Sequence, residues 1–228
     1  MKILASDFDK TLYIDNIDKL KINIESIKNF ISSGNIFCII TGRNYSDLKL
    51  LLNKHNIPYS YLICQDGAKI YNSVDYCINT ILLDSKIVQD LTKLLKEKEC
   101  DYFLDDGYNE TTNINDCVKV VIKYNDKEKA KKLVDEIKSK FKVYIYLSTE
   151  HINIVNMEVN KSNSIKKLLE LENLNKNDVY VIGDEVNDLE MLKHFKGAMM
   201  KNHGKDLDDI NKKEYNYLYE YIEELSKN

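Results

Sequence analysis

The chain has 228 residues, with 37 acidic and 33 basic side chains and a formal net charge of −4. This length allows one domain with a sizeable core, or one domain that carries an inserted subdomain. The basic residues form no block of the kind that nucleic acid binding requires, and no apolar run approaches the roughly 18 residues of a membrane span. We therefore expect no nucleic acid partner and no membrane partner, and no obligate protein partner is evident.

The cysteines and histidines indicate neither disulfides nor a zinc site. The five cysteines are odd in number and lack C-x-x-C spacing, and the four histidines are scattered. Cys38 and Cys64 fall in apolar segments, where a free thiol behaves as a small hydrophobic group. The chain begins on a strand-like segment instead of a signal peptide, so we expect reduced thiols and a cytoplasmic location.

The first predicted element is a short strand at residues 3–5, apolar enough to be buried on both faces. Asp7 and Asp9 follow it, at the end of the strand where ligands bind in open α/β sheets. Two carboxylates so close together require a cation or a shared proton between them, and Mg²⁺ suits an all-oxygen environment. The alternative for this pair alone is a solvated turn or a helix cap.

Helices and strands alternate after this loop, which is typical of a doubly wound parallel sheet. The apolar spacing predicts these elements: a helix through residues 24–31, a strand at 36–40, a helix at 45–55, a strand at 61–64, a turn at 65–68 and a hairpin arm at 69–71. The second strand ends at Thr41, Gly42 and Arg43, again at a carboxyl end. Arg43 is the only arginine of the chain.

The regular alternation of predicted strands and helices changes near residue 78. A helix followed by two strands occurs twice, with helices near residues 87–95 and 130–137 and strands at 102–104, 118–124, 143–147 and 152–155. This order predicts an inserted α+β unit with an antiparallel sheet. We place it at residues 78–158, in a core made of residues 1–77 and 159–228. Residues 105–109 form a turn that either faces the site or is an exposed hairpin tip.

The main pattern resumes after the insert. The sequence predicts a helix at 162–172, a strand at 178–182, a helix at 189–195, a last strand at 198–200 and a closing helix at 218–225. Asn160 and Lys161 open the first of these helices. Gly183 and Asp184 end the strand, so a third acidic group follows a strand at its carboxyl end.

Four motifs now recur in one setting: Asp7-Phe8-Asp9-Lys10-Thr11, Thr41-Gly42-Arg43, Asn160-Lys161, and Gly183-Asp184 with Asn187-Asp188. In this order they resemble the haloacid dehalogenase superfamily of aspartate-nucleophile phosphatases. The resemblance is to the Cof-like branch, whose α/β cap lies between the second and third motifs. It covers the whole chain and implies a Rossmann-like α/β core with an inserted α+β cap.

The resemblance also implies a role for each motif. Asp7 would attack phosphorus to form an aspartyl-phosphate, and Asp9 would protonate the leaving alcohol and then deprotonate water. The residues implied in binding the substrate phosphate are Thr41, Gly42, Arg43, Lys161 and Asn187. The residues implied at a Mg²⁺ site are Asp7, Asp9 through its carbonyl, Asp184, and Asp188 as the group that orients the ligands.

Each motif residue has a simpler alternative. Thr41 could only cap the following turn, and Lys161 could be a solvated lysine at a helix start. Asn187 could cap its helix together with Glu190. Arg43 could pair with an acid at the rim or contact the substrate phosphate, and the sequence does not separate these.

Lys10 and Ser162 stand where glycine is common in the family, which leaves the geometry around the substrate open. The first choice of function is a Mg²⁺-dependent phosphatase acting on a small phosphorylated metabolite, with a sugar phosphate preferred. The enzymatic alternative is a phosphomutase of the same superfamily. A phospho-accepting signalling module or a non-catalytic binding protein is less favoured, because the acids, the threonine and the lysine are all present.

Overall fold

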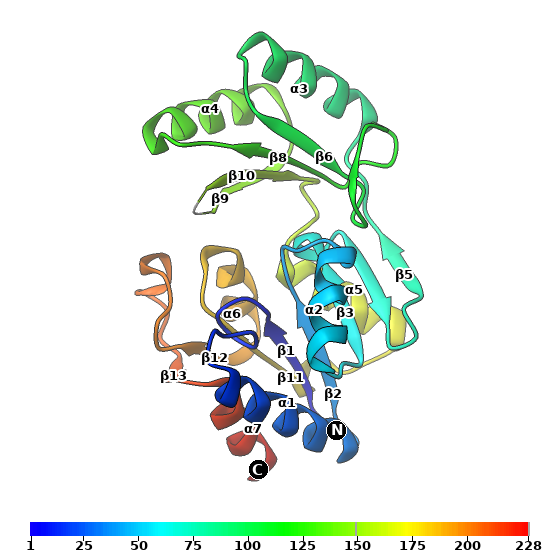
Figure 1. The fold of residues 1–228 in the computed structure, drawn as a ribbon, viewed down its shortest axis with the longest axis vertical. Coiled ribbons are helices and arrows are strands. Elements are labelled where there is room, and N and C mark those ends of the chain that lie inside the picture. Colours follow the sequence, from blue (N-terminus) through cyan, green and yellow to red (C-terminus); the bar gives the residue numbers. More distant parts are fainter. Residues whose placement is uncertain (149, 228) are drawn as a thin grey trace.

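The computed structural model describes residues 1–148 and 150–227. Thr149 and Asn228, which fall within the predicted insert and core ranges, lie outside the described residues. The chain forms one eight-stranded sheet and one five-stranded sheet. Figure 1 shows the two units stacked along the long axis, with both termini at the end of the larger unit that is remote from the smaller one.

The larger sheet has the strand order β13-β12-β11-β1-β2-β3-β4-β5. Its strands are β1 (Ile3–Asp7), β2 (Ile36–Ile40), β3 (Tyr61–Cys64), β4 (Lys69–Asn72), β5 (Cys77–Thr80), β11 (Val179–Gly183), β12 (Lys196–Met200) and β13 (Lys213–Tyr215). All pairs from β13 to β3 are parallel, while β4 and β5 extend the sheet antiparallel. The chain runs outward from β1 in one direction and from β11 in the other. The loops after β1 and β11 therefore meet at the switch point of the sheet, where ligands bind in this architecture.

Helices cover both faces of this sheet (Figure 1). They are α1 (Ile17–Ser32), α2 (Tyr45–His55), α5 (Lys161–Glu172), α6 (Leu189–His194) and α7 (Leu218–Lys227). Leu4 packs in the same apolar cluster as α1, α2 and α7, whereas Ile3 and Ala5 pack with α5 and α6. Successive side chains of β1 thus enter two different cores, which is why this strand is apolar throughout.

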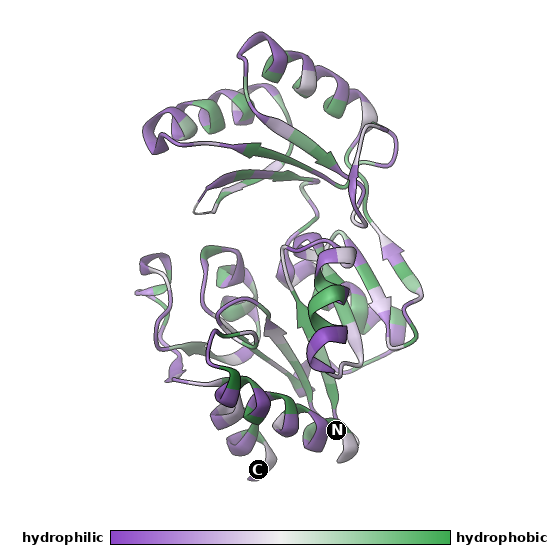
Figure 2. Ribbon diagram, in the orientation of Figure 1, coloured by the Kyte–Doolittle hydropathy of each residue, from purple (hydrophilic) through white to green (hydrophobic). Residues whose placement is uncertain are grey.

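The smaller unit, called the cap from here on, is formed by the elements that lie between β5 and α5 in the chain. Its sheet has the order β7-β6-β8-β10-β9, and every pair is antiparallel. The elements are α3 (Ser85–Glu97), β6 (Tyr102–Asp105), β7 (Glu110–Thr111), β8 (Lys119–Lys123), α4 (Lys127–Lys140), β9 (Tyr144–Leu147) and β10 (His151–Val155). Both helices pack on one face of the sheet, and Figure 2 shows the apolar residues concentrated along the strands.

The predicted fold class is confirmed, and each of the seven predicted helices is present. Three short strands were not predicted: β5, β7 and β13. Because β13 follows β12 at the edge of the sheet, the segment at residues 198–200 is not the last strand. The predicted border at residue 78 falls inside β5, which pairs with β4 in the larger sheet. With four, two and three residues, these strands carry too little alternation to give a periodic signal.

Within residues 1–148 and 150–227, no helix combines the length and the apolar composition that crossing a membrane requires. All five cysteine thiols are free.

Candidate active site

The centre of the site is a group of three buried aspartates at the switch point. Asp7 is the last residue of β1, and Asp184 follows Gly183 at the end of the adjacent parallel strand β11. Asp188 lies in the short 3-10 turn that follows. Each of the three side chains places a carboxylate oxygen within 4.8 Å of the other two. The parallel pairing of β1 and β11 thus brings together residues that are far apart in the sequence.

Lys161 supplies the positive charge of this group. It is the first residue of α5, whose N-terminus is capped by Asn160, and its side chain is fully buried. Its Nζ donates to Asp7 Oδ1 at 2.5 Å and to Asp188 Oδ1 at 2.6 Å. The simpler alternative of a solvated lysine is therefore wrong, because α5 starts directly behind the strand ends.

Asp188 also fixes the loop that carries Asp184. Its Oδ2 accepts hydrogen bonds from the backbone N–H groups of Asp184 at 2.9 Å and Glu185 at 3.0 Å. A Cβ atom on Gly183 would lie 2.3 Å from Asp188 Cγ, so only glycine permits this approach. Asp188 therefore holds both Lys161 and the Asp184 loop in place.

The three aspartates carry more negative charge than one lysine balances. Burial, together with the nearby charges of Asp188 and Asp184, raises the pKa of Asp7 well above its usual value, although Lys161 opposes this. Burial and the charge of Asp188 raise the pKa of Asp184 to about 6, while a hydrogen bond from Thr11 Oγ1 at 2.8 Å acts in the opposite direction. The donors are all carboxylate oxygens, so this group fits a hard divalent cation such as Mg²⁺.

Asp9 lies apart from this group and pairs with Arg43. Arg43 donates from Nε to Asp9 Oδ2 at 2.8 Å and from Nη2 to Asp9 Oδ1 at 2.7 Å. The Asp9 side chain is 44% exposed and the Arg43 side chain is 35% exposed. This bidentate pair matches the first of the two alternatives for Arg43, an ion pair with an acid at the rim.

Thr41 and Asn187 face the same cavity but have different partners. The Thr41 hydroxyl accepts from the backbone N–H of Arg43 at 3.2 Å, so Thr41 does cap its turn. The Asn187 side chain donates to Asp66 Oδ1 at 3.0 Å. The N-cap position of α6 is occupied by Asp188, so the prediction that Asn187 caps this helix with Glu190 is wrong.

Lys10 and Ser162, the two residues at positions where glycine is common in the family, differ in backbone conformation and in burial. Lys10 has a φ of 63°, a left-handed backbone that glycine adopts without strain. Its ammonium reaches across to Glu185 Oε1 at 2.5 Å. Ser162 is buried behind Lys161, and its Oγ has no hydrogen-bond partner among the described residues.

Three residues close to the site were missed at the sequence level: Asp66, Lys119 and Tyr146. Lys119 lies on β8 of the cap, yet its Nζ contacts Asp66 Oδ2 of the core at 2.7 Å. Tyr146 on β9 donates to the same oxygen at 2.5 Å. Burial alone would raise the pKa of Asp66, but the charge and hydrogen bond of Lys119, with the hydrogen bond of Tyr146, hold this pKa below its usual value. A lysine inside the apolar run of residues 117–122 was the available signal.

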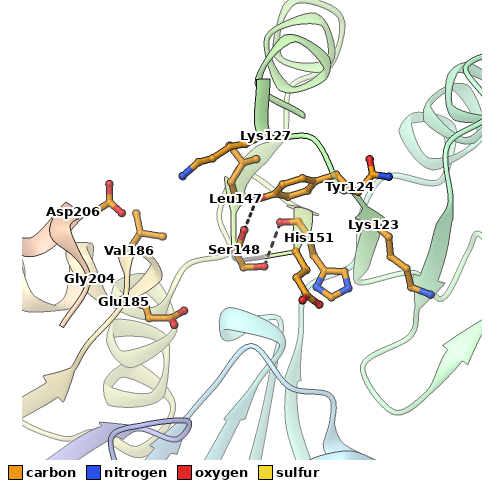
Figure 3. A pocket seen from close by; sticks show the side chains of 12 residues that line it. Lys123, Tyr124, Lys127, Leu147, Ser148, His151, Glu185, Val186, Gly204 and Asp206 are labelled. Carbon is orange, nitrogen blue, oxygen red and sulfur yellow. Dashed lines mark hydrogen bonds between the residues drawn. The ribbon is translucent and has the colours of Figure 1, made fainter. Parts of the chain in front are cut away.

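The site opens into two connected cavities between core and cap. The inner cavity, of about 400 Å³, lies over Asp7 and is lined on the core side by Asp9, Thr41, Gly42, Arg43, Glu185, Val186 and Asn187, and on the cap side by Lys119, Tyr146, Ser148, His151 and Asn153. The outer cavity, of about 900 Å³, shares Ser148, His151, Glu185 and Val186 with it. Figure 3 shows the outer cavity, with Glu185 and Val186 of the core at the left and Ser148 and His151 of the cap to their right.

The turn at residues 105–109 lines neither cavity and is only partly exposed, because Asp105 and Gly107 are buried whereas Tyr108 is 49% exposed. The Gly107 carbonyl accepts from the backbone N–H of Tyr45 at 3.0 Å, and the rings of Tyr108 and Tyr45 stack at 5.2 Å. Asp105 accepts from the Asn44 side chain at 3.3 Å. The prediction of an exposed hairpin tip thus holds only in part, since the turn docks on the N-terminus of α2 while Tyr108 and Asn109 remain exposed.

Comparison with known proteins places this geometry in a family. A family model described as haloacid dehalogenase-like hydrolase matches residues 4–117 and 105–220. Among characterised sequences, the chain is 24% identical to 5-amino-6-(5-phospho-D-ribitylamino)uracil phosphatase of Bacillus subtilis, over 84% of each protein.

Solved structures share the same fold. A phosphatase of the haloalkanoate (HAD) superfamily from Bacteroides thetaiotaomicron is similar with a TM-score of 0.85 and 18% identity, over 99% of this chain and 95% of the other. A HAD subclass IIB sugar phosphatase is similar with a TM-score of 0.81 and 15% identity, over 99% of each chain.

Proposed function

Because the chain belongs to the haloacid dehalogenase-like hydrolases, we propose that it is a Mg²⁺-dependent phosphatase that hydrolyses a small phosphorylated metabolite through an aspartyl-phosphate on Asp7. The observation that carries this proposal is the buried contact of Lys161 with both Asp7 and Asp188, beside Asp184. A phosphate dianion needs positive charge next to an ionised nucleophile, and this arrangement offers both.

Lys161 prepares Asp7 for attack. Its ammonium favours the carboxylate form of Asp7, which burial would otherwise disfavour. In the described part of the chain its partners are two carboxylates, so a third N–H remains to contact a phosphoryl oxygen. Thr41 and Asn187, which line the same cavity, provide further donors to the phosphate.

Mg²⁺, held by Asp7, Asp184 and the Asp9 carbonyl with Asp188 behind them, would offset the charge that develops on the transferring phosphoryl oxygens. The excess of buried carboxylates over ammonium groups supports this assignment. Thr11 keeps Asp184 oriented through its hydrogen bond to Oδ1.

Asp9 is assigned as the general acid and base. It lines the inner cavity at the rim, where its carboxyl group can reach the leaving oxygen and later the attacking water. Arg43 holds that carboxyl group by both oxygens, which favours an orienting role for Arg43 over a direct contact with the substrate phosphate.

The polar residues on the cap side of the inner cavity are suited to bind a leaving group that carries several hydroxyls. Ser148, His151 and Asn153 offer donors and acceptors there, and Asn153 Nδ2 already donates to Ser148 Oγ at 3.2 Å. A sugar phosphate is the substrate class we propose first. The similarity to a sugar phosphatase and to a phosphatase of a phosphorylated ribitylamino compound supports this choice. The five free thiols support a cytoplasmic location.

The experiment that tests the proposal compares Asp7→Asn with Asp9→Asn. Asp7→Asn removes the attacking charge and should abolish both turnover and the phosphoenzyme. Asp9→Asn should slow hydrolysis of alkyl phosphates by about 10²-fold or more, but p-nitrophenyl phosphate much less, because its leaving group needs no proton. Released phosphate is measured with Mg²⁺ and with chelator. A phosphoenzyme that persists in Asp7→Asn, or full activity in chelator, would refute the assignment, and an isomerised sugar phosphate without free phosphate would indicate a phosphomutase.

A further inference from the structure

Asp66 connects three parts of the molecule: its own turn in the core, the cap, and the loop after β11. It lies in the turn between β3 and β4, is 1% exposed, and has a φ of 58°. One carboxylate oxygen accepts from Lys119 and Tyr146 of the cap, and the other accepts from Asn187 of the loop after β11. The turn itself donates to the second motif, from Asp66 N to Thr41 O at 2.9 Å and from Gln65 N to Arg43 O at 3.0 Å.

Lys119 completes this connection and does not bind the phosphate itself. Besides Asp66, its Nζ contacts the Gly42 carbonyl at 3.2 Å and the Tyr146 hydroxyl at 3.3 Å. An ammonium group has three N–H donors, so these acceptors use all of them. The Lys119 side chain is 4% exposed and that of Asp66 is 2% exposed, so the pair is removed from solvent although it joins two units.

This geometry is held from behind by α5. A Cβ atom on Gly67, whose φ is 117°, would lie 2.7 Å from Ser164 Cβ and 2.9 Å from the Asn160 carbonyl oxygen. The Asp66 turn therefore packs directly on the helix that begins with Lys161. A shift of the Asp66 carboxylate would be transmitted to Gly42, to Asn187 and to the start of α5.

We propose that Asp66, Lys119 and Tyr146 form a cap–core lock, and that its closure positions the Thr41–Arg43 turn and Asn187 around the substrate phosphate. The three are positioning residues, since they act through Gly42 and Asn187. A buried ion pair gains little net stability because both charges lose water, so its use here is geometric. The closed cap thus assembles the phosphate site as well as covering it.

The inference rests on the proposed phosphatase function for its kinetic consequence, but the lock itself is testable without turnover. The variants are Lys119→Met, Asp66→Asn and Tyr146→Phe, alone and as the double variant Lys119→Met with Asp66→Asn. The matched control is Lys98→Met, which breaks an ion pair with Glu136 at 2.8 Å that lies wholly within the cap.

The first measurement is backbone amide hydrogen exchange in the absence of substrate, monitored by mass spectrometry. We expect exchange in peptides that cover residues 41–43 and 65–67 to accelerate about tenfold in Lys119→Met and in Asp66→Asn, and less in Tyr146→Phe. The control should leave it unchanged. Unchanged exchange in both charge variants would overturn the lock, whether or not the protein is a phosphatase.

The second measurement is steady-state hydrolysis of p-nitrophenyl phosphate, whose leaving group makes few demands on the cap. We expect Lys119→Met and Asp66→Asn each to lower kcat about 10- to 100-fold with KM changed less than about threefold, because misplaced groups affect the reacting geometry. The double variant should be no worse than the poorer single variant. Losses that multiply, or a loss confined to KM, would overturn the proposal. A wild-type protein that releases no phosphate from any ester would refute the proposed function and leave the exchange result to decide on the lock.

Discussion

Two buried lysines lie within the same site, and their surroundings give them different tasks. Lys161 contacts Asp7 and Asp188 in the core, and these two contacts leave its third N–H donor for the proposed contact with the substrate phosphate. Lys119 comes from the cap, and its three donors are used by Asp66, Gly42 and Tyr146. Charge and burial are nearly the same in both, so the number of N–H donors without a protein partner is what separates the two roles that we propose for them.

The largest expected effect is that of removing Lys161. Lys161→Met should lower kcat for phosphate release by about 10³-fold, since a preorganised donor next to the developing charge is lost. Lys119→Met should cost one or two orders of magnitude less. Steady-state kinetics on one ester, with circular dichroism to verify folding, makes the comparison. Equal losses in the two variants would mean that donor count does not separate the two roles.

The aspartate group around Asp184 and the cap–core lock around Asp66 should change the free energy of unfolding with pH in opposite directions. The pKa of Asp184 is raised from 3.8 to about 6, so the folded state binds more protons than the unfolded state in this interval. The free energy of unfolding of the metal-free protein should therefore fall by about 1–3 kcal/mol as pH rises from 4 to 6. Urea unfolding in chelator measures this, and Mg²⁺ should reverse it.

Asp184→Asn should weaken both this pH dependence and its reversal by Mg²⁺, while Asp7, whose pKa is also raised, retains part of the pH dependence. The pKa of Asp66 is lowered, so its contribution to stability is present above pH 3.8 and is lost as pH falls further. Asp101→Asn, at a side chain that is 71% exposed, is the matched control and should leave the profile unchanged. If the free energy of unfolding of the wild-type protein did not change between pH 4 and pH 6, the site would not hold an excess of buried negative charge.

A smaller effect is expected next to Lys161. Ser162→Ala should raise the free energy of unfolding by about 1 kcal/mol, because it removes a buried hydroxyl that lacks a partner among the described residues. Ser164→Ala on the same helix is the control, since the Ser164 hydroxyl donates to the Lys161 carbonyl at 2.9 Å. That variant should be destabilised. The opposite ranking of the two variants would show that Ser162 is satisfied by bound water.

The smallest effect is expected at Lys10, where the ion pair with Glu185 is exposed. Lys10→Gly relieves the left-handed backbone at φ 63° but loses the ion pair and adds freedom to the unfolded chain. These contributions nearly cancel, so the free energy of unfolding should change by less than about 0.5 kcal/mol. Lys10→Ala keeps the strain and loses the ion pair, and should be the less stable of the two in thermal unfolding. A loss above 1 kcal/mol in Lys10→Gly would mean that this exposed ion pair contributes as much to stability as a buried one.

The sequence predicted the part of the site that depends on strand ends. Asp7, Thr41 and Asp184 each follow an apolar run, and parallel strands bring their carboxyl ends to one edge, so local pattern suffices. Lys119 and Tyr146 reach the site because the cap docks on the core. The spacing of apolar residues along the chain does not predict how two units dock. Asp66 was predicted only as part of a turn, because its partners lie 53, 80 and 121 residues away. Arg43 could not be assigned, since its choice of Asp9 depends on the distance between two loops.

The interrupted core has a consequence for synthesis of the chain. The cap is one continuous segment whose sheet and helices contact each other locally, so it can fold as soon as it leaves the ribosome. β1, in contrast, pairs on one side with β11, and Ile3 must wait for Val179. Until then its apolar edge is open, which is a hazard for aggregation. The candidate site therefore forms only after the whole cap has been synthesised, and a chain that ends before residue 184 contains every element of the cap but lacks Asp184 and Asp188.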